Sequence, residues 1–262
     1  MPERLKEKKI LVTRPRDQAD NLCRLIEKEN GTAIHLPVME IKPVENELAI
    51  QELLSRISSY DIGIFISQNA VRCTLELLNK DIHALYDLKV VAIGKATARL
   101  LKQEGIKNID YADTVATSEA LLELPVFDSQ HLKNARVVIF RGVGGREYLA
   151  ERLSERGAYV DYLEVYHRLP CKHDNTVLNN IFFNEKPDMI VVTSNEGLQN
   201  LFDMLSSDQR EVVLNTQLLV LSKRMETLAL KLGFSKMPVI ADEASDRGML
   251  KAIIHTAGVS AL

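Results

Sequence analysis

The sequence repeats itself at about half of its length. Arg14 and Arg141 each follow a short apolar run, and Ser67 and Ser194 each follow another. The members of both pairs lie 127 positions apart in a chain of 262 residues. Solenoid repeats are much shorter, about 20 to 50 residues, so this period indicates a duplication. We therefore predict two similar modules with a cleft between them.

Each module is predicted to be an α/β structure. Short runs rich in Ile and Val alternate with longer amphipathic segments, a pattern typical of βαβ units and parallel sheets. The predicted strands are 9–13, 34–38, 62–66, 89–93, 108–111, 136–140, 160–166, 189–193, 218–221 and 237–241. The predicted helices between them are 19–30, 70–78, 97–104, 148–156, 197–205 and 225–232. The expected fold class is therefore α/β, with two similar domains that each contain a parallel sheet flanked by helices.

The connection between the modules is not a flexible linker. The sequence has no Pro-, Gly- or Ser-rich stretch there, and three prolines instead bracket two short extended segments: Pro37, Pro43 and Pro170. Segments 40–42 and 164–168 follow extended runs at matching places in the two repeats. We predict that these segments pair as crossing connections and form a hinge.

The charge of the chain argues against a nucleic-acid-binding protein. Lys and Arg number 33 and Asp and Glu number 36, which gives a net charge of −3, whereas nucleic-acid-binding domains usually have a basic excess. No segment approaches the roughly 20 apolar residues of a membrane helix. The apolar stretch after the charged N-terminal segment is too short for a signal peptide. We expect no nucleic-acid partner, no membrane partner and a cytoplasmic location.

The residues that most often hold metals or form covalent intermediates show no characteristic spacing. Cys23, Cys73 and Cys171 lie far apart and are predicted to be buried, reduced thiols. The six histidines show no metal-ligand pattern. There is no G-x-S-x-G motif, no P-loop and no dinucleotide fingerprint. We expect no metal and no cofactor.

The loops after the predicted strands are the candidate ligand-binding segments. Ligands of parallel sheets bind beyond the C-terminal strand ends, where the following helices present unpaired N–H groups. These loops are rich in small, hydroxylated or cationic residues: 13–16, 67–69, 94–97, 141–146, 193–195 and 222–224. Their number indicates a ligand with several carboxylates or phosphates. The alternative at each loop is helix capping alone, because Ser, Thr and Asn are common N-cap residues.

Six short motifs occur in a characteristic order. They are Thr13-Arg14-Pro15, Ser67-x-Asn69-Ala70-Val71, Ala92-Ile93-Gly94-x-x-Thr97-Ala98, Arg141-Gly142-x-x-x-Arg146, Val165-Tyr166-x-Arg168 and Thr193-Ser194. Together with the twofold repeat, they resemble the uroporphyrinogen-III synthase family from about residue 9 to residue 250. The resemblance implies that the first strand–helix unit of each repeat is exchanged into the other domain, and that a two-stranded hinge joins the domains. The implied boundaries are 1–36 with 171–262 for domain one, 42–164 for the inserted domain two, and 37–41 with 165–170 for the hinge strands.

The resemblance also implies a reaction. Members of this family are lyases of haem and related tetrapyrrole biosynthesis. They close the linear tetrapyrrole hydroxymethylbilane into uroporphyrinogen III, with loss of water and inversion of the last pyrrole ring. The substrate carries eight carboxylates, which agrees with the many candidate anion-binding loops. Electron-rich pyrroles expel the hydroxyl themselves, so the protein would chiefly align the reacting carbons. The expected partner is hydroxymethylbilane, and we expect a monomer.

The site residues come from the same resemblance. Tyr166 is implied as the catalytic residue that assists departure of the hydroxyl, because a phenol can donate a proton or a hydrogen bond. The alternative for Tyr166 is a half-buried hinge residue. The implied substrate-binding residues are Thr13, Arg14, Ser67, Asn69, Gly94, Lys95, Thr97, Arg141, Arg146, Thr193, Ser194 and Ser222. Arginines at helix starts can instead form surface salt bridges that contribute little stability.

One loop departs from the family pattern. Where the second repeat of many members carries Gly-x-x-Thr-Ala, residues 222–226 of this chain are Ser-Lys-Arg-Met-Glu, so no hydroxyl stands at Met225. Either Ser222 or Thr227 replaces it, or Lys223 and Arg224 supply charge instead.

Two other functions are consistent with the sequence. A non-catalytic two-domain sensor of a polyanionic small molecule is the first, because hinged binding proteins also close on their ligands. An enzyme that acts on a nucleotide or a sugar phosphate is the second, and phosphorylated ligands would then protect the protein. Tyr166 is the feature that favours the enzyme of tetrapyrrole synthesis over the sensor.

Overall fold

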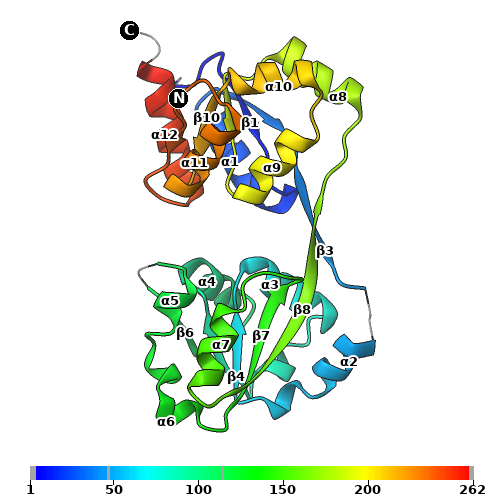
Figure 1. The fold of residues 1–262 in the computed structure, drawn as a ribbon, viewed down its shortest axis with the longest axis vertical. Coiled ribbons are helices and arrows are strands. Elements are labelled where there is room, and N and C mark those ends of the chain that lie inside the picture. Colours follow the sequence, from blue (N-terminus) through cyan, green and yellow to red (C-terminus); the bar gives the residue numbers. More distant parts are fainter. Residues whose placement is uncertain (1–3, 46–47, 114, 260–262) are drawn as a thin grey trace. The chain divides into compact units, whose positions relative to one another are not determined.

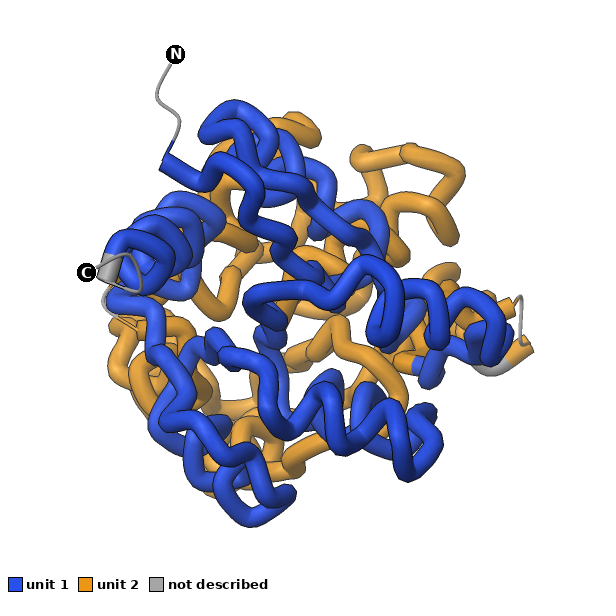
Figure 2. The backbone as a smooth tube through the Cα atoms, turned by 90° about the horizontal axis from the view of Figure 1, so that it is seen from above, with its two compact units in different colours: residues 1–40, 169–262 blue, residues 41–168 orange. Residues whose placement is uncertain are grey.

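The chain forms two compact units. The computed structural model describes residues 4–45, 48–113 and 115–259. Unit 1 comprises Met1–Glu40 and Leu169–Leu262, and unit 2 comprises Ile41–Arg168 (Figure 2). Residues 1–3 and 260–262 of the predicted domain one lie outside the described residues.

Unit 1 contains a five-stranded sheet in the order β11-β10-β9-β1-β2, and every pair of neighbouring strands is parallel. Helices follow most of its strands along the chain (Figure 1). Its elements are β1 (Lys9–Val12), α1 (Arg16–Lys28), β2 (Thr32–His35), α8 (Asn175–Asn179), the π-helix η4 (Asn180–Glu185), β9 (Met189–Val191), α9 (Asn195–Asp203), α10 (Ser207–Leu214), β10 (Gln217–Val220), α11 (Lys223–Leu232), β11 (Val239–Ile240) and α12 (Asp246–Val259).

Unit 2 contains a six-stranded sheet in the order β3-β8-β7-β4-β5-β6. The five strands from β8 to β6 are parallel. The strands are β3 (Met39–Pro43, which begins in unit 1), β4 (Ile62–Phe65), β5 (Lys89–Ala92), β6 (Ile109–Tyr111), β7 (Arg136–Gly142) and β8 (Tyr159–Pro170, which ends in unit 1). The helices are α2 (Leu48–Ser55), η1 (Ile57–Ser59), α3 (Gln68–Leu77), η2 (Ile82–Leu85), α4 (Lys95–Gln103), α5 (Ser118–Leu121), η3 (Pro125–Phe127), α6 (Ser129–Leu132) and α7 (Tyr148–Glu155).

The two sheets repeat one strand order. In the repeat, β1, β2, β4, β5 and β6 correspond to β7, β8, β9, β10 and β11, so both sheets have the same sequence of equivalent strands. The first two strands of each repeat have changed places: β1 pairs with β9, and β7 pairs with β4. These pairs confirm the predicted fold class, including the exchange of strand–helix units.

Two strands carry the chain between the units. β3 and β8 are neighbours at the edge of the second sheet. Near their ends, the Val44 N–H donates to the Val165 carbonyl at 3.1 Å, and the Cys171 N–H donates to the Val38 carbonyl at 3.2 Å. The partners run in opposite order along the chain, so the two segments are antiparallel. The predicted pairing of 40–42 with 164–168 is confirmed.

Helices cover the sheet of unit 2 on both faces, which explains why its central strands are continuously apolar. All four residues of β4 are buried. Phe65 and Phe140 stack on one face with their ring centroids 4.1 Å apart, whereas Ile64 and Ile139 belong to the core on the other face. This alternation fixes the register of the strands, because a shift by one residue would move each side chain to the opposite face.

Several predicted boundaries were wrong. The strand predicted at 34–38 is Thr32–His35, because Thr32 already pairs with Lys9 of β1. The strand predicted at 160–166 continues to Pro170, where it forms the crossing connection. Helix α12 was not predicted, and its Gly248 and Gly258 have low helix propensity. Tertiary packing compensates, since Met249 and Ile253 of α12 are buried in the core.

The prediction for the cysteines was partly wrong. All three are free thiols, but only Cys73 is buried, and Cys23 and Cys171 are partly exposed. Partial burial still raises the pKa of the Cys23 and Cys171 thiols, because it disfavours the thiolate.

Tyr60 is expected to make the stability of unit 2 decrease at alkaline pH. Its side chain is buried, its Oη donates to Asp161 Oδ2 at 2.7 Å, and burial together with this bond raises the pKa of Tyr60 from 10.0 to about 12. The folded state therefore retains the phenol proton longer than the unfolded state. We expect the stabilisation to be complete below pH 10 and to disappear as the pH rises to about 12.

Urea unfolding between pH 9 and 12 tests this prediction for Tyr60. Tyr60→Phe should reduce the decline in stability above pH 10. The control is Tyr159→Phe, because Tyr159 is 66% exposed and should leave the decline unchanged. Equal declines in the wild type and Tyr60→Phe would contradict the prediction.

Candidate active site

Tyr166 lies in β8 and contacts Ser67, which is 99 positions earlier in the chain. The Tyr166 Oη and the Ser67 Oγ are 3.1 Å apart, and either can be the donor. Tyr166 is buried, with 2% of its surface exposed. The alternative prediction of a half-buried residue was therefore wrong about its burial. Ser67 follows β4 and is the N-cap of α3, where its Oγ accepts from the Ala70 N–H at 3.0 Å. The structure thus brings two of the predicted site residues into contact.

Arg168 lies two residues after Tyr166 and reaches the same phenol oxygen. Its Nη1 donates to the Tyr166 Oη at 3.3 Å, and its Cζ lies 5.6 Å from the centroid of the Tyr166 ring. Sequence reasoning placed Arg168 in a motif but gave it no role. The available signal was its spacing, because residues i and i+2 of a strand point to the same face.

Arg141 lies under the loop 142–147, which follows β7. Its side chain is only 3% exposed. Its guanidinium donates to the Gly142 carbonyl at 3.3 Å, to the Arg146 carbonyl at 3.5 Å and to the Gly144 carbonyl. It also lies 4.4 Å from the centroid of the Tyr162 ring. The loop is therefore built around a buried cation.

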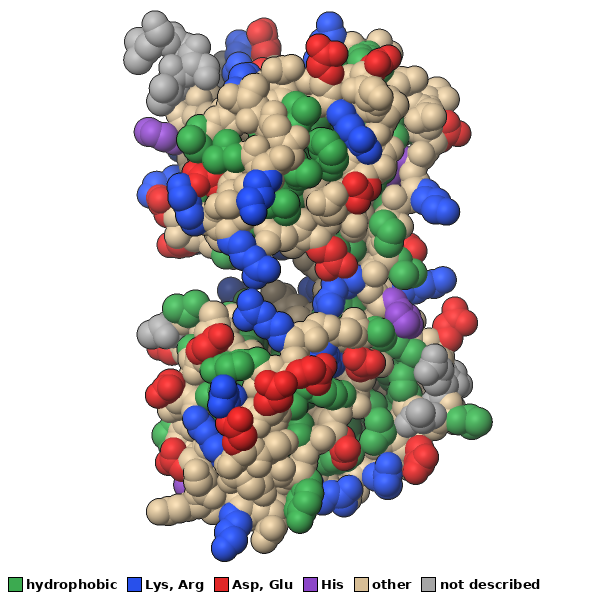
Figure 3. All heavy atoms as spheres, in the orientation of Figure 1, with side chains coloured by type: hydrophobic (Ala, Val, Ile, Leu, Met, Phe, Trp, Pro, Cys, Tyr) green, Lys and Arg blue, Asp and Glu red, His purple; other side chains and the backbone are tan. Residues whose placement is uncertain are grey.

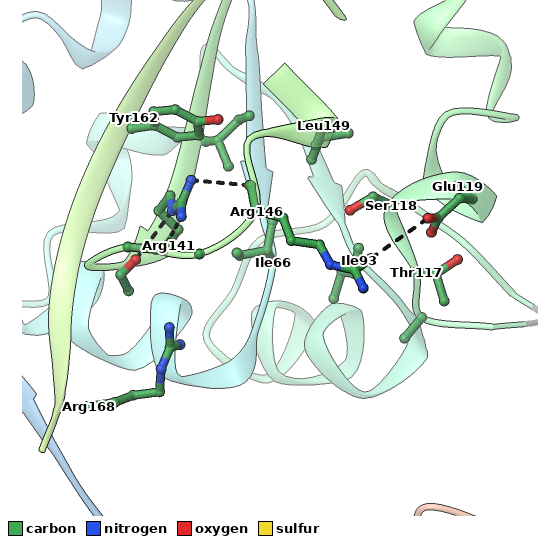
Figure 4. A pocket seen from close by; sticks show the side chains of 15 residues that line it. Ile66, Ile93, Thr117, Ser118, Glu119, Arg141, Arg146, Leu149, Tyr162 and Arg168 are labelled. Carbon is green, nitrogen blue, oxygen red and sulfur yellow. Dashed lines mark hydrogen bonds and ion pairs between the residues drawn. The ribbon is translucent and has the colours of Figure 1, made fainter. Parts of the chain in front are cut away.

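A pocket of about 340 Å³ opens between this loop and the start of α5. Figure 4 shows Arg168 rising from β8 toward the Arg141 loop, and Arg146 reaching across the pocket toward Glu119. Arg146 is 72% exposed and its nearest Glu119 oxygen is 4.0 Å away, so this ion pair is weak. The pocket volume is at the lower end of the range for small-molecule sites.

The other predicted residues of unit 2 lie at the starts of α3 and α4. Gly94 is the buried N-cap of α4, Lys95 is exposed, and Thr97 is 4% exposed. Asn69 is partly buried in the first turn of α3. Because β4 and β5 are parallel, both helix starts lie at the same edge of the sheet.

In unit 1, Thr13 and Arg14 follow β1. The Thr13 side chain is buried, and its Oγ1 donates to the Val191 carbonyl at 2.8 Å. Arg14 forms an ion pair with Asp246 at 2.6 Å. Both side chains therefore have partners within unit 1.

The remaining predicted residues of unit 1 follow β9 and β10. Ser194 caps α9 by accepting from the Gly197 N–H at 2.9 Å, and Ser222 caps α11 by accepting from the Met225 N–H at 3.4 Å. Thr193 directly precedes Ser194 and is partly buried. These serines have the capping geometry that was the alternative to ligand binding.

Several side chains of loop 222–226, which departs from the family pattern, have partners within unit 1. Met225 is buried in the core of unit 1, and Lys223 forms an ion pair with Glu226, which is also buried. Thr227 donates from its Oγ1 to the Lys223 carbonyl at 3.0 Å.

Three further observations concern surface charge, metal ligands and membrane-spanning helices. On the face seen in Figure 3, Lys and Arg side chains are interspersed with Asp and Glu side chains over each unit. Within the described residues, no cluster of three or more His, Cys, Asp or Glu side chains could hold a metal ion. Among the helices of residues 4–45, 48–113 and 115–259, none is long and apolar enough to cross a membrane.

Comparisons with known proteins agree with the motifs. The family model described as "Uroporphyrinogen-III synthase HemD" matches residues 20–251. The uroporphyrinogen-III synthase of Escherichia coli is 32% identical over 246 residues, which cover 93% of this chain and 99% of that protein. The enzyme of Salmonella typhimurium has the same identity and coverage.

Solved structures support the fold. A mutant uroporphyrinogen III synthase from Thermus thermophilus has a TM-score of 0.60 at 19% identity and covers 97% of this chain and 99% of its own. The enzyme of Helicobacter pylori has a TM-score of 0.62 at 16% identity and covers 95% of this chain and 99% of its own. From the family match over most of the chain and the identity to the Escherichia coli enzyme, we conclude that this chain belongs to the uroporphyrinogen-III synthase family.

Proposed function

We infer that the chain is a uroporphyrinogen-III synthase. It closes hydroxymethylbilane into uroporphyrinogen III, with loss of water and inversion of the last pyrrole ring. The observation that carries this function is the family match over residues 20–251. A phenol held between a hydroxyl and a guanidinium in unit 2 supports it.

Tyr166 is the proposed catalytic residue. A phenol can protonate the leaving hydroxyl and so assist its departure as water. The electron pair that replaces the broken C–O bond comes from the pyrrole, so no nucleophile of the protein is needed. Ser67 supports the assignment because its hydrogen bond fixes the direction of the Tyr166 side chain.

The other predicted residues are proposed to act on the carboxylates of the substrate in two ways. Arg146 and Lys95 are exposed cations of unit 2 that can approach a carboxylate. Asn69, Gly94, Thr97, Thr193, Ser194 and Ser222 lie at helix starts, where backbone N–H groups favour anions.

Three predicted residues have partners within the protein that favour a supporting role. For Arg141 we propose that it holds the loop 142–147 in place, because its donors are directed to carbonyls of that loop. Thr13 and Arg14 similarly bond to Val191 and Asp246. Contacts of these three side chains with the substrate stay predictions.

The domain boundaries and the setting of the protein are also proposals. We propose that domain one comprises 1–36 and 171–262, that domain two comprises 42–164, and that 37–41 and 165–170 are hinge strands. A monomer in a reducing cytoplasm stays the prediction.

The test supplies freshly generated hydroxymethylbilane to the purified protein. After oxidation, the uroporphyrin isomers are separated and quantified. We expect mainly the type III isomer with the protein and the type I isomer without it. If the folded protein yields only type I, the proposed function is wrong, and tests of a non-catalytic sensor of polyanions should follow.

A further inference from the structure

A bulge in β8 determines what Tyr166 faces. Arg141 of β7 is opposite Glu164, but the next residue, Gly142, is opposite Tyr166, so the register shifts by one residue at this point. The Val143 N–H donates to the Tyr166 carbonyl at 2.8 Å and fixes this alignment. Bulges of this kind redirect side chains and are frequent beside active sites.

Gly142 is a glycine because the Tyr166 ring occupies the space of a side chain. A Cβ at Gly142 would lie 2.6 Å from Cε2 and 2.7 Å from Cζ of Tyr166, and 3.1 Å from Nη1 of Arg168. The backbone of Gly142 is outside the left-handed region, so any residue could adopt its conformation. The requirement for glycine at this position is therefore the close approach of the phenol and the guanidinium.

The hydrogen bonds at the Tyr166 Oη restrict the direction of its proton. A guanidinium has no acceptor, so Arg168 can only donate to the Oη. The Ser67 Oγ already accepts from the Ala70 N–H, and its own hydrogen can be donated to the Oη. If both neighbours donate, they occupy both lone pairs of the phenol oxygen, and the phenol hydrogen is available to a third group.

We propose that Arg168 is a positioning residue for proton donation by Tyr166, and that Gly142 provides the space for this arrangement. The proposal rests on the proposed function. In the step, the Tyr166 O–H bond breaks as its proton moves to the hydroxymethyl oxygen of the substrate. The C–O bond breaks and water leaves. The pyrrole electrons shift, so that an exocyclic C=C bond forms at the former hydroxymethyl carbon and the nitrogen lone pair forms a C=N bond within the ring. Arg168 and Ser67 stabilise the resulting phenolate until the final ring closure. The pyrrole carbon that forms the last C–C bond then loses its hydrogen as a proton, which returns to the phenolate.

The main test is a double-mutant cycle between Arg168 and Tyr166. The measured quantity is the rate at which the type III isomer forms. Arg168→Gln should lower kcat about 10- to 100-fold and change KM by less than about threefold, because the lost bond acts on the proton donor. Arg168→Lys should restore part of kcat. In the Tyr166→Phe background, Arg168→Gln should have less than about a twofold effect.

The matched control for Arg168→Gln is Arg152→Gln. Arg152 also lies over a tyrosine, 5.3 Å from the centroid of the Tyr148 ring, and is ion-paired with Glu155, but it is on α7. It should leave kcat and KM unchanged. An equal loss from Arg168→Gln in both Tyr166 backgrounds, or a raised KM with an unchanged kcat, would overturn the proposal and make Arg168 a contact for a substrate carboxylate.

A second variant tests the space at Gly142. Gly142→Ala should lower kcat about tenfold or more, because the added methyl group displaces the Tyr166 ring. Gly258→Ala in α12 is the control, since a Cβ there meets nothing within 4 Å. Wild-type kcat in a folded Gly142→Ala protein would overturn this part of the proposal. If Gly142→Ala does not fold, the Arg168 series still decides, and a wild type that makes no type III isomer would instead refute the proposed function.

Discussion

Replacing Tyr166 with Phe is expected to lower kcat for uroporphyrinogen III formation by about 100-fold or more and to change KM by less than about threefold. General acid catalysis typically contributes 10²- to 10⁴-fold, and the substitution removes only the donor. The ring stays, and its buried surface continues to pack in unit 2. The free energy of unfolding should change by less than about 1 kcal/mol, because Ser67 keeps its bond from Ala70.

Initial rates of type III formation and urea unfolding together test this prediction for Tyr166. The control is Tyr60→Phe, which also removes a hydrogen-bonded phenol of unit 2 but acts on Asp161. It should leave kcat unchanged at neutral pH. If Tyr166→Phe has the kcat of the wild type, the phenol is a packing residue and another group must assist the departure of the hydroxyl.

The fold was largely predictable because the central strands of its sheets are buried on both faces. Such strands are short, continuous apolar runs, and the repeat shows which runs are equivalent. The exchange of strands between repeats was not predictable from the pattern. The runs of β1 and β7 are equally apolar and would complete either sheet, so this feature came from the resemblance to the family.

The loops that form the candidate site were predictable from the sequence, but the contacts between their side chains were not. Ser67 and Tyr166 are 99 positions apart, and their contact depends on the pairing of β7 between β4 and β8. The register shift beside Gly142 has no distinct sequence signal, because a bulge is an insertion of one residue in an otherwise ordinary strand. The role of Gly142 therefore became clear only from the ring that approaches it.

Arginines show a further limit of sequence reasoning. Arg141 and Arg146 are five positions apart in one motif, and from the sequence both were predicted to bind substrate. The structure separates them, since the Arg141 side chain is 3% exposed and the Arg146 side chain is 72% exposed. Their expected effects on stability consequently differ, although both charges lie beside one pocket.

Replacing Arg141 with Met is expected to lower the free energy of unfolding by about 3 kcal/mol. Methionine retains much of the length of the side chain, but it cannot donate to the carbonyls of Gly142, Gly144 and Arg146. Hydrogen bonds from a charged group contribute about 1.5 to 3 kcal/mol each at good geometry. The bonds to Gly142 and Arg146 are long, at 3.3 and 3.5 Å, and removal of a buried charge regains its desolvation cost, so the net loss is about 3 kcal/mol. Lost Coulomb attraction to Glu147 and Glu164 adds less, because the Glu147 side chain is 58% exposed and the Glu164 side chain is 39% exposed.

Urea unfolding of Arg141→Met, with Arg152→Met as the control, measures this effect. Arg152 is 47% exposed, so its removal should change the free energy of unfolding by less than about 0.5 kcal/mol. Hydrogen exchange provides a local readout. The amide of Gly144, which donates to Glu164 at 2.9 Å, should lose protection because the loop no longer surrounds a cation. A change below about 1 kcal/mol with full protection at Gly144 would show that Arg141 does not hold the loop, and direct binding of a substrate carboxylate would then be the better explanation for a buried arginine at this pocket.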